Sequence, residues 1–228
     1  MSHKPQPVIR YAMSRRRRSI LISLAMLFFA GLAALDHSCA SRSLNAPAKT
    51  VAEQDSRDTT KYHGRQFTVI YVVDGDTLDI DVPDVNRAST RIRLWGVDTP
   101  ETKKPGAPIM YFGPEAAEFA RASAINKKVT IYLDPQRRNR DKYGRLLAYV
   151  QLADSGASHG WRRSFLNELL LSEGYAYADV RFEHVNYHKY QQLESSARAA
   201  KKGLWKDVTR EQLPQWLQDR KPNLLSGK

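Results

Sequence analysis

The chain has 228 residues, of which 42% are hydrophobic and 10% aromatic, enough for one or two domains with an ordinary apolar core. Its 36 Lys and Arg against 24 Asp and Glu give a net charge of +12. Such a charge favours a polyanionic partner, nucleic acid or anionic lipid, although a solvated soluble surface explains it equally well. Cys39 is the single cysteine, which excludes an intramolecular disulfide.

Residues 1–40 have the organisation of an export signal. Four consecutive arginines precede the apolar run 20–35, and Ser38-Cys39-Ala40 offers small residues for cleavage after Ala40. The run is short for a ~30 Å hydrocarbon core but suits a signal peptide. Because the basic flank stays cytoplasmic, we expect the rest of the chain to be exported. It would be periplasmic or secreted after cleavage, and otherwise membrane-anchored through residues 20–35; the sequence leaves both open.

The next segment changes from polar to strand-like. Residues 41–62 are polar and without periodicity, which predicts a flexible linker ahead of a domain over 63–208. Five runs rich in β-branched and aromatic residues then predict strands, the first two as a hairpin. These runs cover 66–73, 77–82, 91–97, 129–133 and 146–152.

Three segments have helical patterns, at 113–125, 162–174 and 184–203, and a short helical stretch near 211–219 lies in the C-terminal tail 209–228. Strands in hairpin order with helices between and after them predict an α+β fold. It would be a five-stranded β-barrel of the oligonucleotide-binding type (OB-fold) with about three α-helices, preceded by an N-terminal signal or anchor helix.

Three short motifs lie at strand ends: "DGDT" (74–77), "RLWGVDTPET" (93–102) and "DKYGR" (141–145). Each alone is typical of a turn. In this order, with "YFGPEA" and a closing "KKGLW", they resemble the thermonuclease family of staphylococcal-nuclease-like domains. The agreement runs from about Phe67 to Trp205, nearly all of the predicted globular part.

The resemblance implies a hydrolase, a Ca²⁺-dependent endonuclease that cleaves phosphodiester bonds of DNA and RNA with low sequence specificity and prefers single strands. Carried over by motif, Asp76 and Asp98 would bind Ca²⁺ through their carboxylates and Thr99 through its carbonyl. Arg93 and Arg145 would hold the phosphate. The chemistry agrees, because Ca²⁺ prefers oxygen ligands and guanidinium groups bind phosphate oxygens in a fork.

The remaining family positions concern the water and the substrate. Glu101 would orient or deprotonate the attacking water, a choice that the sequence leaves open. Lys142 and Tyr143 match the family's phosphate-contacting loop. The family's two stacking tyrosines fall at Val180 and Phe182; a valine cannot stack on a base, so base preference stays open.

Two other functions compete with the nuclease. One is a non-catalytic OB-fold module that binds nucleic acid, and the other is a membrane-anchored interaction protein whose basic face binds anionic lipid or glycan. The nuclease is favoured because all five residues carried over for metal binding and catalysis are present: Asp76, Arg93, Asp98, Glu101 and Arg145. His184 and His188 have a zinc-like spacing, but Val185 stands where a metalloprotease motif needs Glu. Nothing indicates an oligomer, so we expect a monomer.

Overall fold

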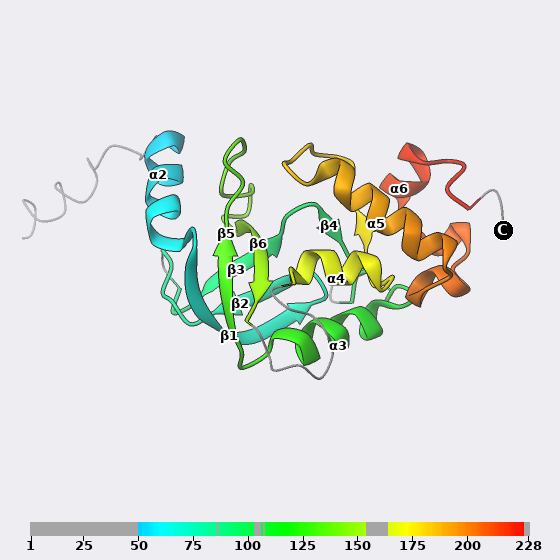
Figure 1. The fold of residues 1–228 in the computed structure, drawn as a ribbon, viewed down its shortest axis with the longest axis horizontal. Coiled ribbons are helices and arrows are strands. Elements are labelled where there is room, and N and C mark those ends of the chain that lie inside the picture. Colours follow the sequence, from blue (N-terminus) through cyan, green and yellow to red (C-terminus); the bar gives the residue numbers. More distant parts are fainter. Residues whose placement is uncertain (1–49, 86, 103–105, 107, 154–163, 226–228) are drawn as a thin grey trace, which may run out of the picture. The chain divides into compact units, whose positions relative to one another are not determined.

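The computed structural model of the protein describes residues 50–85, 87–102, 106, 108–153 and 164–225 (Figure 1). The expected signal or anchor segment, 1–40, lies outside the described residues, as does the apolar run within it. Within the described ranges, no helix is both long and apolar enough to cross a bilayer.

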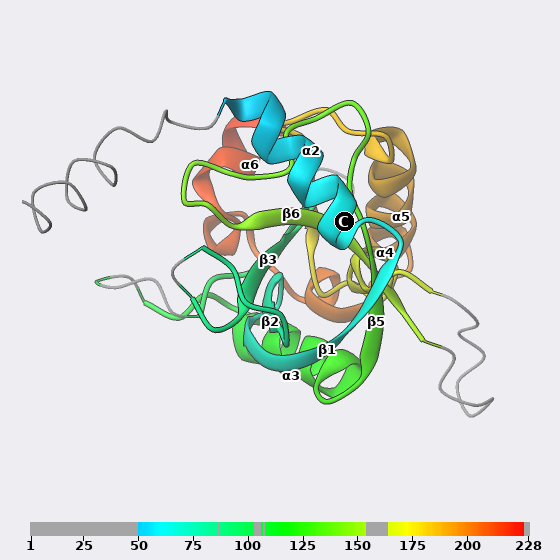
Figure 2. The same cartoon turned by 90° about the vertical axis from the view of Figure 1, so that its left-hand side faces the viewer.

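Five strands form a closed barrel in the order β1-β2-β3-β6-β5, which confirms the predicted barrel (Figure 2). They are β1 (Arg65–Asp74), β2 (Thr77–Ile80), β3 (Thr90–Leu94), β5 (Lys128–Tyr132) and β6 (Leu146–Leu152). Neighbouring strands are antiparallel except β3 and β6, which run parallel. That pair departs from simple hairpin order, and it places the loop before β6 beside the loop before β3, where Arg140 forms an ion pair with Asp84.

Strand β3 shows how the barrel presents polar groups at its outer face. Thr90, Ile92 and Leu94 are buried in the barrel, whereas Arg91 and Arg93 alternate with them. Successive side chains of a strand point to opposite faces, so the alternation holds both arginines outside the apolar interior. Arg93 thereby reaches the end of the barrel at which the turn after β1 and the chain after β3 meet.

Helices cover the barrel on two sides (Figure 1). Three α-helices correspond to the three predicted ones: α3 (Gly113–Ala124), α4 (Leu166–Ser172) and α5 (Tyr187–Ala199). The structure adds α2 (Val51–Tyr62), α6 (Gln215–Arg220), the 3₁₀ helices η1 (Gly203–Lys206) and η2 (Arg210–Gln212), and a small sheet of β4 (Val97–Asp98) with β7 (Tyr177–Ala178). In Figure 1, α4, α5 and α6 lie on one side of the barrel and α2 on the other.

The prediction of a flexible linker over 41–62 is wrong for its second half, which is helix α2. Thr50 caps this helix, because its hydroxyl accepts the backbone N–H of Glu53 while the Glu53 carboxylate accepts that of Thr50. Such a reciprocal cap satisfies two donors that a helix start otherwise leaves unpaired. Residues 41–49 lie outside the described part of the chain.

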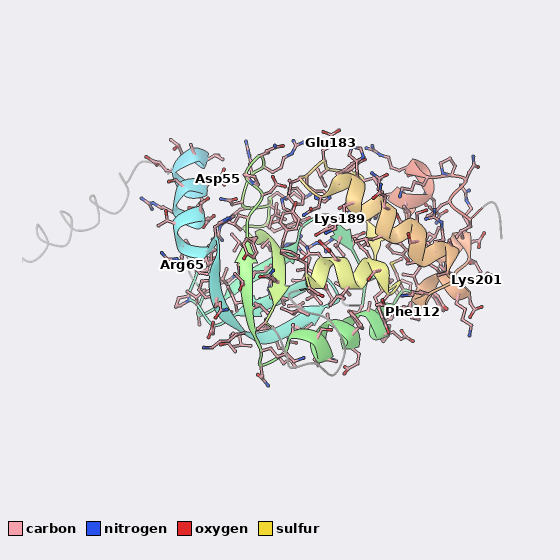
Figure 3. All side chains as sticks on the ribbon, viewed as in Figure 1. Asp55, Arg65, Phe112, Glu183, Lys189 and Lys201 are labelled. Carbon is pink, nitrogen blue, oxygen red and sulfur yellow. The ribbon has the colours of Figure 1, made fainter. Side chains whose placement is uncertain are left out.

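Polar contacts, rather than an apolar stripe, hold α2 against the domain. The carboxylate of Asp58 accepts two hydrogen bonds from Arg140, at 2.7 and 2.8 Å. Asp55, labelled in Figure 3, accepts the backbone N–H of Asn139 at 2.9 Å. Tyr62 at the end of the helix is fully buried in the barrel core. The loop before β6 is therefore fixed to α2.

The C-terminal tail is also part of the packed structure. Leu213 and Leu217 are buried in a second apolar cluster with Tyr177, Leu204 and Trp205, beside the barrel core. The predicted short helix in the tail is confirmed as α6, and its apolar face lies in this cluster. Residues beyond the expected domain boundary at 208 thus help to build the end of the molecule at which β4 and β7 pair.

Candidate active site

The turn after β1 and the chain after β3 are in direct contact. The backbone N–H of Thr99 donates to Asp76 Oδ2 at 2.9 Å. A Cβ atom at Gly75 would lie 2.7 Å from Thr99 Cγ2, closer than such atoms approach, so the contact requires glycine in the turn. Asp76 and Thr99 are both buried. The structure therefore brings together two of the residues predicted to bind metal.

Arg93 lies between the two predicted carboxylate ligands. Its guanidinium contacts Asp76 Oδ2 through one nitrogen, and its other nitrogen donates to Asp98 Oδ1 at 2.5 Å. The Arg93 side chain is 12% exposed. Burial alone would lower its pKa, but the neighbouring carboxylates, Asp76 and Asp98 first, outweigh that effect and hold the pKa above the usual range for arginine. Arg93 stays charged and fixed at this place.

The site carries more negative charge than Arg93 neutralises. Burial, followed by the neighbouring Asp76, raises the pKa of Asp74 to about 7, and Glu101 adds to the rise. Burial also raises the pKa of Asp98. Crowded buried carboxylates raise one another's pKa unless a cation compensates. This end of the barrel is thus suited to a further positive charge.

The donor set fits a calcium ion in part. Among the described residues, no three His, Cys, Asp or Glu side chains are placed to share one metal ion. Asp76 and Asp98 do converge on one cationic group, the Arg93 guanidinium, which stands where two carboxylates could meet a cation. Two carboxylates, completed by a backbone carbonyl and water, are ligands that Ca²⁺ accepts. Asp76 and Asp98 therefore supply part of a calcium ligand set.

A groove of about 820 Å³ opens beside Arg93, and we call it the basic groove. Seven of its lining residues are basic and three are acidic: Arg93, Arg137, Arg138, Arg140, Lys142, Arg145 and Arg181 against Asp141, Asp179 and Glu183. Tyr143 and Phe182 line it as well. The predicted carboxylates do not line the groove. Arg93 connects two of them, Asp76 and Asp98, to the groove, and Arg181 also reaches Asp98 from it.

The loop before β6 supplies one wall of the groove. Arg145 Nε donates to Asp141 Oδ2 at 2.6 Å, and the same carboxylate accepts the backbone N–H of Tyr143 and of Arg145. Lys142 and Arg145 both lie over the ring of Tyr143, at 5.0 and 5.4 Å from its centre. Tyr143 is 68% exposed. The predicted phosphate and substrate groups of this loop thus share one exposed surface.

The opposite wall comes from the segment after β7. Phe182 is 58% exposed and its ring lies 6.5 Å from that of Trp95. Arg181 forms a two-pronged ion pair with Asp179, with both bonds at 2.8 Å, and lies 3.4 Å from Asp98. The sequence analysis missed Arg181, because this residue belongs to none of the motifs. The only signal in the sequence is its position between Val180 and Phe182.

His184 has a structural place beneath this wall. Its ring stacks on Trp95 with 5.7 Å between ring centres, and its Nδ1 lies 3.0 Å from the hydroxyl of Tyr149. Burial lowers the pKa of His184 to about 4, so the ring is neutral at pH 7. Gly96 has a φ of +69°, and a Cβ there would collide with His184 Nε2. The glycine in "RLWGVDTPET" therefore makes room for this buried ring.

Comparison with known proteins agrees with this arrangement. A family described as "Staphylococcal nuclease homologue" matches residues 91–207, from β3 to the residue after η1. The chain belongs to this family.

Relatives of the staphylococcal nuclease family cover most of the folded part. A protein named thermonuclease from Staphylococcus hyicus is 38% identical over 143 residues, 61% of this chain and 75% of the relative. A second thermonuclease, from Staphylococcus intermedius, is 34% identical over 150 residues, 65% of this chain and 81% of the relative. A prophage-derived endonuclease of Bacillus subtilis is 33% identical over 140 residues, 60% of this chain and 43% of the relative.

Proposed function

We propose that the chain is an exported or membrane-tethered nuclease that requires Ca²⁺ and hydrolyses phosphodiester bonds of DNA and RNA with little sequence specificity. The chain is a nuclease of the staphylococcal nuclease family; its metal, substrates and location are the proposal. One observation carries it. Arg93 binds the two predicted metal ligands, Asp76 and Asp98, and at the same time lines the basic groove.

The groove's arginines would bind the scissile phosphate. Hydrolysis gathers negative charge on the nonbridging oxygens, and donors already aimed at those oxygens stabilise it. Arg93 and Arg145 line the same groove and carry planar guanidinium groups that donate in pairs. Arg93 is fixed by two carboxylates and Arg145 by Asp141, so neither has to be ordered when substrate binds.

The carboxylates would divide the remaining work. The charge of Glu101 contributes to the raised pKa of Asp74, and Glu101 would orient or deprotonate the attacking water. The water gives up a proton, to Glu101 or to solvent, as its oxygen bonds to phosphorus. The ester bond to the leaving oxygen breaks, and that oxygen takes up a proton from solvent. Asp76 and Asp98 would hold Ca²⁺, with the carbonyl of Thr99. When bound, the ion supplies Lewis-acid polarisation of the phosphoryl oxygen.

Single strands suit this groove better than duplexes. Tyr143 and Phe182 are both exposed and line the groove from its two walls. Unpaired bases can stack on such rings, whereas paired bases are already stacked on each other. Exposed lysine and arginine side chains bind the strand through its phosphates, which gives affinity without sequence choice.

Removing calcium tests the enzyme directly. We expect the full chain to cut single-stranded DNA and RNA with Ca²⁺ and to lose at least ~10²-fold of its rate in EGTA, since the metal contributes several kcal/mol to the transition state. Adding Ca²⁺ back should restore the rate, and Mg²⁺ at the same concentration serves as control. Salt-sensitive binding of DNA without cleavage under any of these ions would instead identify a non-catalytic module.

The location is tested on the protein in its own cell. If residues 1–40 direct export, the nuclease domain should be found outside the cytoplasm. N-terminal sequencing of the exported protein then separates the two forms, since a cleaved signal gives a new N-terminus at Ser41 and an anchor keeps residues 20–35. Recovery of the intact chain in the cytoplasm only would contradict the proposed location.

A further inference from the structure

The C-terminal helix α6 places an indole ring against the site. Trp216 donates its Nε1–H to Asp98 Oδ2 at 2.8 Å, across 118 positions of the sequence. The residue lies beyond the segment that matches the family, which ends at 207. No motif of the sequence singles out Trp216. The contact nevertheless reaches one of the two carboxylates that the nuclease is proposed to use for Ca²⁺.

Several independent contacts hold Trp216 in this place. The next residue, Leu217, is fully buried in the second apolar cluster. Just past the helix, Lys221 forms a 2.8 Å ion pair with Glu194, whose side chain is completely buried. The guanidinium of Arg181 lies over the Trp216 ring, 4.3 Å from its centre, on the side of the basic groove. The buried Leu217 and the Lys221–Glu194 ion pair therefore hold the helix in place, and Arg181 covers one face of the indole.

The two oxygens of Asp98 consequently have different partners. Oδ2 accepts the indole N–H, whereas Oδ1 accepts Arg93 Nη2 at 2.5 Å. An indole nitrogen can only donate a hydrogen bond, so it holds the carboxylate as an acceptor and sets its rotation. Oδ1 is thereby left on the side of Asp76, which binds the other nitrogen of Arg93.

We infer that Trp216 is a positioning residue for the calcium site, which fixes Asp98 so that Oδ1 faces the ion. The inference rests on the proposed calcium-dependent function. Partners that orient a metal ligand typically contribute 10–100-fold to metal affinity. If Trp216 only packed against its neighbours, any ring of similar size could replace it. The N–H group would then have no effect on calcium binding.

Replacing Trp216 by phenylalanine separates the two roles. Trp216→Phe keeps an aromatic ring beneath Arg181 and removes the N–H donor together with the five-membered part of the indole. Leu217 still fills the second apolar cluster, so folding should survive. We expect calorimetric titration of the full chain with Ca²⁺, without nucleic acid, to show about tenfold weaker binding for the variant. The Ca²⁺ concentration for half-maximal cleavage should rise by the same factor. Gln215→Ala, an exposed change on the same helix, should bind Ca²⁺ as the unchanged chain does.

The outcomes distinguish this inference from the proposed function. Equal calcium affinity of Trp216→Phe and the unchanged chain, with both folded by circular dichroism, would overturn the positioning role alone. Absence of calcium binding by the unchanged chain would overturn the proposed metal, and the inference would fall with it. Weaker binding by Gln215→Ala as well would show that α6 acts through packing and would also overturn the role of the N–H group.

Discussion

Arg145→Ala is expected to lower kcat/KM for single-stranded DNA at least ~10²-fold while the protein stays folded. A preorganised donor to the charge that develops in the transition state commonly contributes this much. The side chain lies at the groove surface, 28% exposed, and its only ion pair in the described structure is with Asp141, four residues earlier. Such a partly exposed pair contributes ~0–1 kcal/mol to stability, so the loss should appear in the rate and not in unfolding.

Two further variants separate the charge of Arg145 from the shape of its guanidinium group, and both from the general attraction of the groove for DNA. Arg145→Lys keeps the charge but not the planar fork, so we expect its rate to fall between the unchanged protein and Arg145→Ala. Arg138 lines the same groove but is exposed, and Arg138→Ala removes only a screened charge. Its rate should therefore change much less. Equal loss of activity in Arg138→Ala and Arg145→Ala would contradict a specific contact between Arg145 and the scissile phosphate.

The barrel could be predicted from the sequence because its signals are local. In β3, uncharged and charged residues alternate from Thr90 to Leu94, and this period of two places the uncharged side chains inside. Turns with glycine or proline separate most of the strands. The barrel closes through the parallel pairing of β3 with β6. This pairing depends on the whole topology, and no local sequence pattern predicts it.

Helix α2 escaped prediction because its stabilising partners are remote. Only Asp58 and Tyr62 are buried in it, too few to give an apolar period. Asp55 and Asp58 find their partners, Asn139 and Arg140, about eighty positions later. A polar, charged segment looks like a linker until those partners are known, since isolated short helices are marginal in water.

Some residues of the candidate site could likewise be predicted from local motifs, and others could not. The motif residues Asp76, Arg93 and Asp98 meet because Asp76 lies in the turn between β1 and β2, Arg93 lies near the end of β3, and Asp98 ends the short strand β4 that follows it. Arg181 and Trp216 reach Asp98 from later segments that carry no motif. Their roles depend on how the C-terminal tail packs, which spacing in the sequence cannot show.

Arg140→Ala is expected to destabilise the protein by roughly 3–5 kcal/mol, the largest effect on stability among these variants. Arg140 donates to both carboxylate oxygens of Asp58 and to both of Asp84, and it also donates to the carbonyl of Gly144 at 2.9 Å. The side chains of Asp58 and Asp84 are 3% and 9% exposed. Alanine would leave two buried carboxylates without this shared cation, which is the costly way to break a buried ion pair.

Denaturant unfolding measures the effect, and hydrogen exchange locates it. We expect α2 (51–62) to exchange faster in Arg140→Ala, because Asp58 on this helix is one of the two partners. Arg137→Ala is the matched control from the same loop. Its partner Glu183 is 79% exposed and 3.4 Å away, so its loss should change stability by no more than ~0.5 kcal/mol. Equal stability of the two variants would mean that Asp58 and Asp84 find water when Arg140 is removed, and that α2 is not held by this network.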